Sequence, residues 1–252
     1  MNYHEFGRED RGAIVLIHPS VVTWDYFERV IPLLEGDYRV IVPALPGYDL
    51  SNDSEFTSVE QIASEIGEHL VQSGIGEAEA VYGCSMGGSI ALRMAVDGRV
   101  KARHTILDGG ITPYQLPWIL TRFIALRDFC VLGLGKLGGE RLMAKAFSSS
   151  QYSDEDYRYI AGVLKHCTCR TIWNTFDSCN NYAMPKTPIH TEGVVHYWYA
   201  EKEQKARKLD LKFMRKFVPD TRFKSFPGVD HGDMAAFKPE QFARELRDTI
   251  EG

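Results

Sequence analysis

Residues 78–95 combine a short apolar run, a tight glycine-flanked turn and a helix-compatible run, and they constrain the fold more than any other stretch. At the turn, residues 83–87 read Gly-Cys-Ser-Met-Gly, a G-x-S-x-G pattern. A serine on such a strand-to-helix turn has a strained backbone and an exposed hydroxyl, and the residues two positions away on either side must be small. The flanking glycines meet that need, and Gly88 lets the helix pack closely against the sheet. The positive N-terminal end of the helix then faces Ser85.

Continuous apolar runs recur along the chain and are typical of strands buried on both faces of a parallel sheet. We expect an edge strand at 1–7, one before Ser85, and others at 13–17, 38–42, 105–107, 194–199 and 222–226. Helical spacing of apolar residues predicts helices at 24–34, 206–217 and 239–250, and another that begins with a Thr57–Glu60 capping box. Strands that alternate with helices predict an α/β fold, with a mostly parallel central sheet and helices on both faces.

The alternation stops between residues 111 and 187, where several helical stretches occur without strand patterning. A block of this length between two strands either completes the core or forms a helical lid over a substrate pocket, and we favour the lid. The predicted organisation is a core of residues 1–110 and 188–252 with a lid at 111–187. The large apolar residues of the block are expected first of all to pack, and some of them to face the pocket (Trp118, Phe123, Phe129, Trp173 and Phe176).

Composition excludes several classes of protein. The net charge of -5, from 29 basic and 34 acidic side chains without a basic block, argues against nucleic acid as a partner. The polar start of the chain lacks a signal-peptide pattern, and charges interrupt the most apolar region, 118–134, so no membrane association is expected. Five cysteines, an odd number, fit reduced thiols in a cytoplasm. The sequence leaves the oligomeric state, including a homodimer, open.

At this point the chain resembles the α/β-hydrolase superfamily over nearly its whole length. The resemblance is carried by residues 18–19 (His-Pro) after the first buried strand, the turn at 83–87, and residues 231–232 (His-Gly) after the last strand. It implies a nucleophilic Ser85, followed in chain order by an acid and then a histidine, and a helical lid where 111–187 falls. These motifs are poor guides to the substrate.

A serine hydroxyl needs a neighbouring base to remove its proton during attack, and histidine suits that role near neutral pH. Among eight histidines we select His231, because its loop follows the last predicted strand. The resemblance makes His18 structural, as the residue that orients the oxyanion loop. The other six are expected to be ordinary surface or core residues (His4, His69, His104, His166, His190 and His196).

A carboxylate should orient His231 and stabilise its protonated form. The family usually places this acid just beyond the strand predicted at 194–199, and its Gly-x-x-Asp pattern, aligned on Ala200, puts Glu203 in the acid position. Asp108 is the second candidate, because some members take the acid from the preceding strand, and Glu201 is a third. A solvated charge within the run 201–207 is the alternative interpretation of Glu203.

In the family, two backbone N–H groups bind the oxyanion. One belongs to the residue after the nucleophile, here Met86, and the other to the residue after a His-Gly pair, here Ser20 with Val21 as the alternative. This chain has proline at position 19, which lacks an N–H and fixes its own φ, so the loop could follow a different path.

These residues predict a serine hydrolase that cleaves an ester, thioester or related acyl bond of a small or medium apolar substrate through an acyl-enzyme on Ser85. No cofactor and no metal are expected, because the spacing of Cys167 and Cys169 with nearby histidines fits no closed zinc pattern. Two alternatives stay open. The same triad could perform carbon–carbon bond hydrolysis, lyase or perhydrolase chemistry, or the fold could serve as a small-molecule receptor.

Overall fold

The computed structural model describes residues 1–113, 116–146 and 152–252. Its centre is a seven-stranded sheet with the order β1-β3-β2-β4-β5-β6-β7. Only β1 runs antiparallel to its neighbour, and the other pairs are parallel. The strands are β1 (Asn2–Phe6), β2 (Ala13–Ile17), β3 (Arg39–Ala44), β4 (Glu77–Cys84), β5 (Lys101–Asp108), β6 (Val194–Ala200) and β7 (Arg222–Phe226). The predicted α/β class with a mostly parallel sheet is confirmed.

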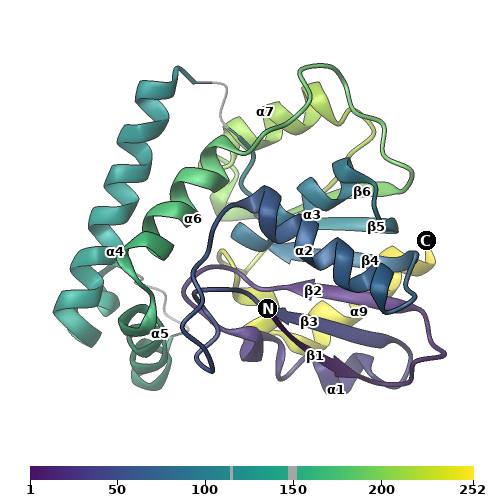
Figure 1. Ribbon diagram of the computed structural model, residues 1–252, viewed down its shortest axis with the longest axis horizontal. Coiled ribbons are helices and arrows are strands. Elements are labelled where there is room, and N and C mark those ends of the chain that lie inside the picture. The colour runs from purple at the N-terminus through teal and green to yellow at the C-terminus, as the bar shows by residue number, and fades with distance from the viewer. Residues whose placement is uncertain (114–115, 147–151) are drawn as a thin grey trace.

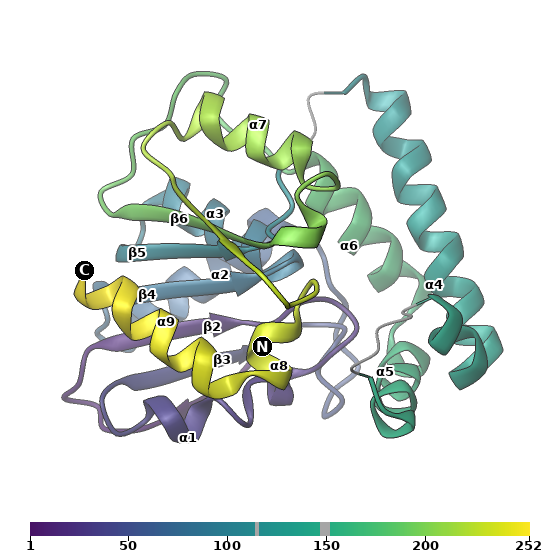
Figure 2. The same cartoon turned by 180° about the vertical axis from the view of Figure 1, so that it is seen from behind.

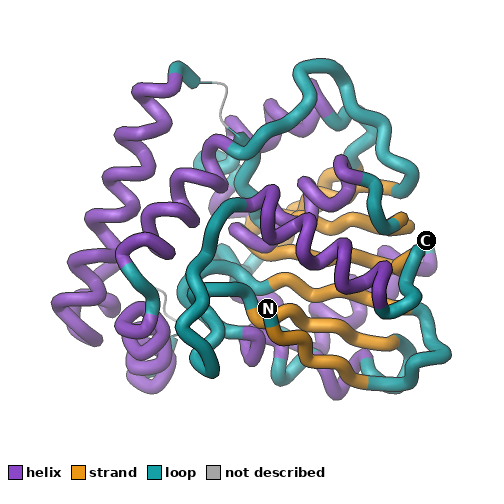
Figure 3. Tube along the Cα trace, in the orientation of Figure 1, coloured by secondary structure: helices purple, strands orange, loops and turns teal. Residues whose placement is uncertain are grey.

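Helices cover both faces of the sheet (Figures 2 and 3). One face packs against α2 (Val59–Gln72), α3 (Met86–Asp97) and α7 (Lys208–Phe217), and the other against η1 (Trp24–Phe27), α1 (Ile31–Leu34), α8 (Asp233–Phe237) and α9 (Pro239–Glu251). Successive side chains of a strand point to opposite faces. In β2, Val15 and Ile17 therefore join the first core, while Ile14 and Leu16 join the second. This explains why the strand sequences are continuously apolar.

Three helices follow β5 and lie beside the sheet rather than on its faces (Figure 1). They are α4 (Trp118–Ala146), α5 (Asp154–His166) and α6 (Cys169–Asn181). Tyr159 of α5 contacts the loop after β2, and Thr171 of α6 contacts Gly47 in the loop after β3, so these helices stand at the carboxyl edge of the sheet. The division into a core and a lid stays a prediction. Trp118 and Phe123, which we expected to pack, are 64% and 65% exposed.

Local boundaries differ from the prediction in three places. The helix expected at 24–34 is split into η1 and α1, because Pro32 has no N–H to continue a helix through this segment. The N-cap of α2 is Ser58 rather than Thr57, since the Ser58 hydroxyl accepts the hydrogen bond from the Gln61 N–H at 3.1 Å. The short helix α8 was not predicted. No helix among the described residues is long and apolar enough to span a membrane.

Candidate active site

Ser85 stands on the turn between β4 and α3, with φ of 52° and ψ of -113°. A non-glycine residue in this region of backbone space costs on the order of 1–3 kcal/mol and persists only where its surroundings enforce it. The flanking glycines show that enforcement. A Cβ on Gly83 would lie 2.0 Å from the Gly87 carbonyl oxygen, and one on Gly87 would lie 2.2 Å from that of Ile17. Larger side chains would therefore open the turn that presents the serine.

The loop that carries His231 reaches the same edge of the sheet. The N–H of Ser85 donates to the Asp108 carbonyl at 2.8 Å, and the next residue, Gly109, lies directly against the imidazole. A Cβ on Gly109, whose φ is 57°, would lie 2.6 Å from His231 Nδ1. On the other side, Tyr26 donates a hydrogen bond to the Gly232 carbonyl at 2.6 Å. His231 therefore lies against Gly109, and the residue before Gly109, Asp108, is hydrogen-bonded to the backbone of Ser85.

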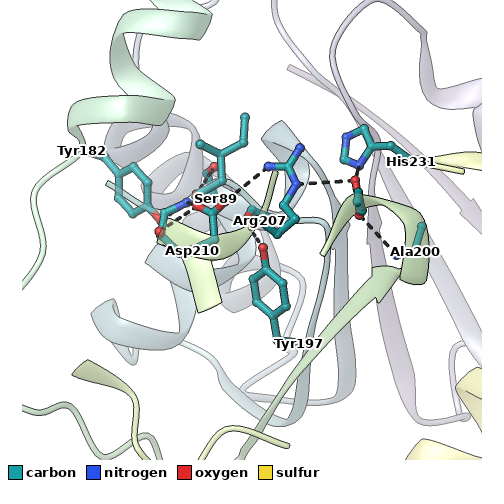
Figure 4. A network of polar contacts seen from close by, with 11 residues as sticks. Ser89, Tyr182, Tyr197, Ala200, Arg207, Asp210 and His231 are labelled. Atoms are coloured by element: carbon teal, nitrogen blue, oxygen red, sulfur yellow. Dashed lines mark hydrogen bonds and ion pairs between the residues drawn. The ribbon is translucent and has the colours of Figure 1, made fainter. Parts of the chain in front are cut away.

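His231 has a carboxylate partner, Glu203. The distance between His231 Nδ1 and Glu203 Oε2 is 2.9 Å (Figure 4). Glu203 ends a short 3₁₀ turn after β6, and its Oε1 accepts the Ala200 N–H at 3.3 Å. Glutamate is one methylene longer than the aspartate that the family usually has here, and this turn holds its carboxylate close to the end of β6. Burial alone would raise the pKa of Glu203, but the hydrogen bond and charge of His231, with the charge of Arg207, hold it below its usual value.

The other two candidate acids face elsewhere. Asp108 accepts a hydrogen bond from the Tyr82 hydroxyl at 2.6 Å on its Oδ2. Its burial raises its pKa, and the bond from Tyr82 offsets only part of that effect. Glu201 is exposed to solvent. Of the carboxylates considered from the sequence, Glu203 is therefore the one that the structure places in contact with His231.

The loop after β2 contains a buried histidine, His18, that is hydrogen-bonded to two backbone groups. The Leu45 N–H donates to His18 Nε2 at 3.3 Å, so Nδ1 carries the proton and donates to the Pro19 carbonyl at 2.8 Å. Burial lowers the pKa of His18 to about 4, which keeps it neutral. The next residues, Ser20 and Val21, follow an unusual path, because Val21 has a φ of 64°. Proline at position 19 thus accompanies a strained loop.

The two predicted oxyanion donors, Met86 and Ser20, belong to segments that touch each other. Met86 is the first residue of α3, where a helix leaves its N–H groups without intrahelical partners. The loop that carries Ser20 touches the first turn of that helix, because a Cβ on Gly87 would also lie 2.9 Å from the His18 carbonyl oxygen. The positive end of the α3 dipole therefore faces the space beside Ser85.

The described residues offer little to hold a metal. Among the side chains that the structure describes, no three histidine, cysteine, aspartate or glutamate residues are grouped closely enough for an ion. Cys167 is buried with its sulfur 3.2 Å from the Gly47 carbonyl oxygen, whereas Cys169 is exposed. One of these two cysteines is thus enclosed by the protein and the other faces solvent.

Comparison with known proteins places this chain in a family. A model described as the alpha/beta hydrolase family matches residues 14–245. The chain belongs to the alpha/beta hydrolase family. The chain is also similar to the magnesium-chelatase 30 kDa subunit of Rhodobacter capsulatus, with 33% identity over 142 residues, which is 54% of this chain and 49% of that protein. It spans about half or less of the length of the curated relatives that it matches.

Solved structures with a similar fold superpose over nearly the whole chain. MenH from S. aureus gives a TM-score of 0.79 at 15% identity, covering 99% of this chain and 97% of that one. A carboxylesterase structure from Nitrososphaera gargenis gives 0.75 at 17% identity, covering 99% and 93%. At these identities the likeness establishes the fold alone.

The candidate site of this alpha/beta hydrolase family member contains contacts that the sequence did not predict. The Tyr159 hydroxyl of α5 accepts the Thr23 N–H at 2.8 Å and donates to Asp25, so it ties a helix of the 111–187 block to the loop after β2. Tyr26 ties the same loop to the His231 segment. Neither contact has a sequence signal, because both join residues more than 130 positions apart. The sequence shows Gly109 and Gly110 as a pair that ends a strand. It does not show that Gly109 packs against the His231 ring.

Proposed function

We propose that the chain is a serine hydrolase that cleaves an ester, thioester or related acyl bond of a small or medium apolar substrate. The observation that carries this proposal is the 2.9 Å contact of His231 with Glu203, at the edge of the sheet where Ser85 is held in a strained turn. An imidazole with an anchored carboxylate and a serine on a strained turn at the same edge of the sheet are the parts that acyl transfer requires.

In the proposed mechanism, Ser85 Oγ attacks the carbonyl carbon of the substrate while His231 Nε2 takes the hydroxyl proton. Glu203 keeps Nδ1 protonated, so that Nε2 is free to accept, and its charge stabilises the imidazolium that forms. The carbonyl electron pair moves onto oxygen, where the N–H groups of Met86 and Ser20 are the proposed donors.

The intermediate then collapses. The bond to the leaving alcohol or thiol breaks, and His231 returns the proton to that group, which leaves the acyl chain on Ser85. Water, deprotonated by His231, attacks the acyl-enzyme in the same way and releases the acid. No cofactor takes part in this scheme.

The preference for apolar substrates is supported by the 111–187 block. Its helices stand at the carboxyl edge of the sheet, where alpha/beta sheets place their ligands. Phe129 of α4 and Trp173 of α6 pack edge to face with ring centroids 5.8 Å apart, which gives this block an apolar interior.

A fluorophosphonate probe tests the mechanism directly. We expect stoichiometric labelling of folded protein on Ser85, with none in Ser85→Ala, and turnover of p-nitrophenyl esters that varies with acyl chain length. Labelling without ester turnover would favour carbon–carbon bond hydrolysis, lyase or perhydrolase chemistry on the same triad. Absence of labelling in folded protein would overturn the acyl-enzyme and leave the receptor interpretation.

A further inference from the structure

Two charged residues of the run after β6, Glu203 and Arg207, are largely withdrawn from solvent. Arg207 lies between two carboxylates, with its Nε 3.5 Å from Glu203 Oε2 and its Nη1 3.4 Å from Asp210 Oδ2. Its side chain is 16% exposed, that of Glu203 12% and that of Asp210 0%. In Figure 4, dashed lines join His231 and Arg207 to the same carboxylate, which is that of Glu203, and join Arg207 to Asp210. Buried charges in direct contact act on one another much more strongly than exposed ones.

Asp210 is held in place by the segment that also supports the imidazole. Its Oδ1 accepts hydrogen bonds from both the N–H and the hydroxyl of Thr112, each at 2.8 Å. Thr112 lies three residues after Gly109, which contacts His231. The intervening carbonyls of Gly110 and Ile111 accept bonds from Tyr197 and Ser89 at 2.8 and 2.7 Å. Asp210 is therefore fixed relative to the floor of the site.

Arg207 and His231 contact the same oxygen of Glu203. An arginine with no other anion nearby would form a two-pronged pair with that carboxylate. Such a pair would offset the negative charge that the imidazolium needs and would compete for the oxygen itself. Asp210 engages the other arm of the guanidinium and supplies a second negative charge.

We propose that Asp210 is a positioning residue for catalysis, which draws Arg207 partly away from Glu203 so that the Glu203 carboxylate stays available to His231. This inference rests on the proposed function, since it assigns Glu203 and His231 their roles. Arg207 in turn restrains the long glutamate side chain. The glutamate at this position thus comes with its own charge-balancing pair, Arg207 and Asp210.

Substitutions at Arg207 and Asp210 leave the other charged side chains near His231 in place. They are Asp108 at the end of β5, Asp233 in α8, and the Lys202–Asp230 ion pair, whose atoms lie 3.1 Å apart. Any change in the titration of His231 between variants therefore reports the pair itself.

The test combines Asp210→Asn, Arg207→Met and the double variant. Asparagine can still accept both Thr112 bonds, so Asp210→Asn removes charge with little change of shape. We expect it to lower kcat about 10-fold and to move the acidic limb of kcat/KM about half a pH unit lower, because Arg207 then offsets the charge of Glu203. In the Arg207→Met background the same substitution should change kcat less than about 2-fold, since no arginine remains to compete.

A second measurement is independent of turnover. The midpoint of the His231 Cε1–H titration by NMR should fall in Asp210→Asn and return toward the wild-type value in the double variant. Arg207→Met alone leaves a buried carboxylate unpaired and could fold poorly, but the double variant removes both charges and keeps the test decisive. Arg99→Met, which breaks the exposed pair with Glu68, is the matched control and should shift neither value.

Equal losses of kcat from Asp210→Asn in both backgrounds, with an unmoved His231 titration, would overturn the inference and leave Asp210 a structural residue. That outcome differs from failure of the proposed function. If wild-type protein shows neither fluorophosphonate labelling nor Ser85-dependent turnover, the hydrolase proposal fails, while the NMR titrations still measure whether the pair acts on His231.

Discussion

The Nδ1 atom of His231 lies 2.9 Å from Oε2 of Glu203, a carboxylate that follows β6, while Asp108 at the end of β5 is bonded to Tyr82 instead. Glu203 and Asp108 were both candidates for the acid, and their hydrogen bonds distinguish them. The one in contact with His231 has its pKa lowered by that contact, whereas the other has its pKa raised by burial. Glu203 is thus the carboxylate that both touches the imidazole and has its ionised form favoured, which suits it to stabilise an imidazolium.

Glu203→Gln should lower kcat by about 10³-fold, because the amide cannot stabilise the protonated imidazole or fix its tautomer. Glu203→Asp should cost about 10-fold, since its shorter side chain withdraws from His231. Steady-state ester hydrolysis measures both. Glu201→Gln is the matched control and should stay within about 2-fold of wild type. If Glu203→Gln kept wild-type kcat and Asp108→Asn were inactive, Asp108 would be the acid that orients the histidine.

Gly87→Ala should destabilise the fold by about 2–3 kcal/mol, because its Cβ would lie 2.2 Å from the Ile17 carbonyl oxygen and the turn must open to accept it. Gly162→Ala in α5 should instead stabilise the protein by about 0.5–1 kcal/mol, since nothing lies within 4 Å of the added atom and alanine favours a helix. Urea unfolding at one pH compares the two. Similar effects of both substitutions would contradict the steric account of the serine turn.

Tyr159→Phe should lower kcat about 10-fold, because the loop that carries Ser20 loses its tie to α5 and the oxyanion donor is less well placed. Stability should fall by about 1–2 kcal/mol, as the Thr23 N–H loses its partner. Tyr3→Phe removes a comparable hydroxyl bond, 3.2 Å long, between β1 and the carbonyl of Glu65, and should leave kcat unchanged. An unaltered kcat in Tyr159→Phe would separate this helix from catalysis.

His18 makes stability depend on pH in a defined direction. Its folded pKa of about 4 lies below the ordinary value of 6.5, so the folded state binds its proton less readily than the unfolded state does. The contribution is fully present above pH 6.5 and is lost as pH falls toward 4. Between pH 7 and 5, wild type should lose about 2 kcal/mol more unfolding free energy than His18→Gln, whose side chain does not titrate. Equal losses in chemical denaturation would refute this.

The sequence predicted the parts of the fold that depend on local pattern. The continuous apolar runs at 13–17 and 38–42 indicate strands covered on both faces, and the structure has them there. Pattern alone did not reveal where the helix at 24–34 breaks, although Pro32 was a visible signal. It also did not reveal α8, because five residues are too few for a helical repeat to stand out.

Ser85 and its glycine neighbours could be read from the sequence because five consecutive residues set the geometry of the turn. His231 and Glu203 could be proposed only from their places after predicted strands, and the choice between Glu203 and Asp108 had to stay open. That choice depends on which hydrogen bonds form among side chains from β4, β6 and the loop after β7, which are far apart along the chain. Arg207 and Asp210, which look like ordinary surface charges in the sequence, are a buried pair only because folding brings Thr112 against them. Neighbouring residues determine the steric limits of a tight turn, so these can be read from the sequence. The partners of a buried charge depend on how distant segments pack together, so only the tertiary structure shows them.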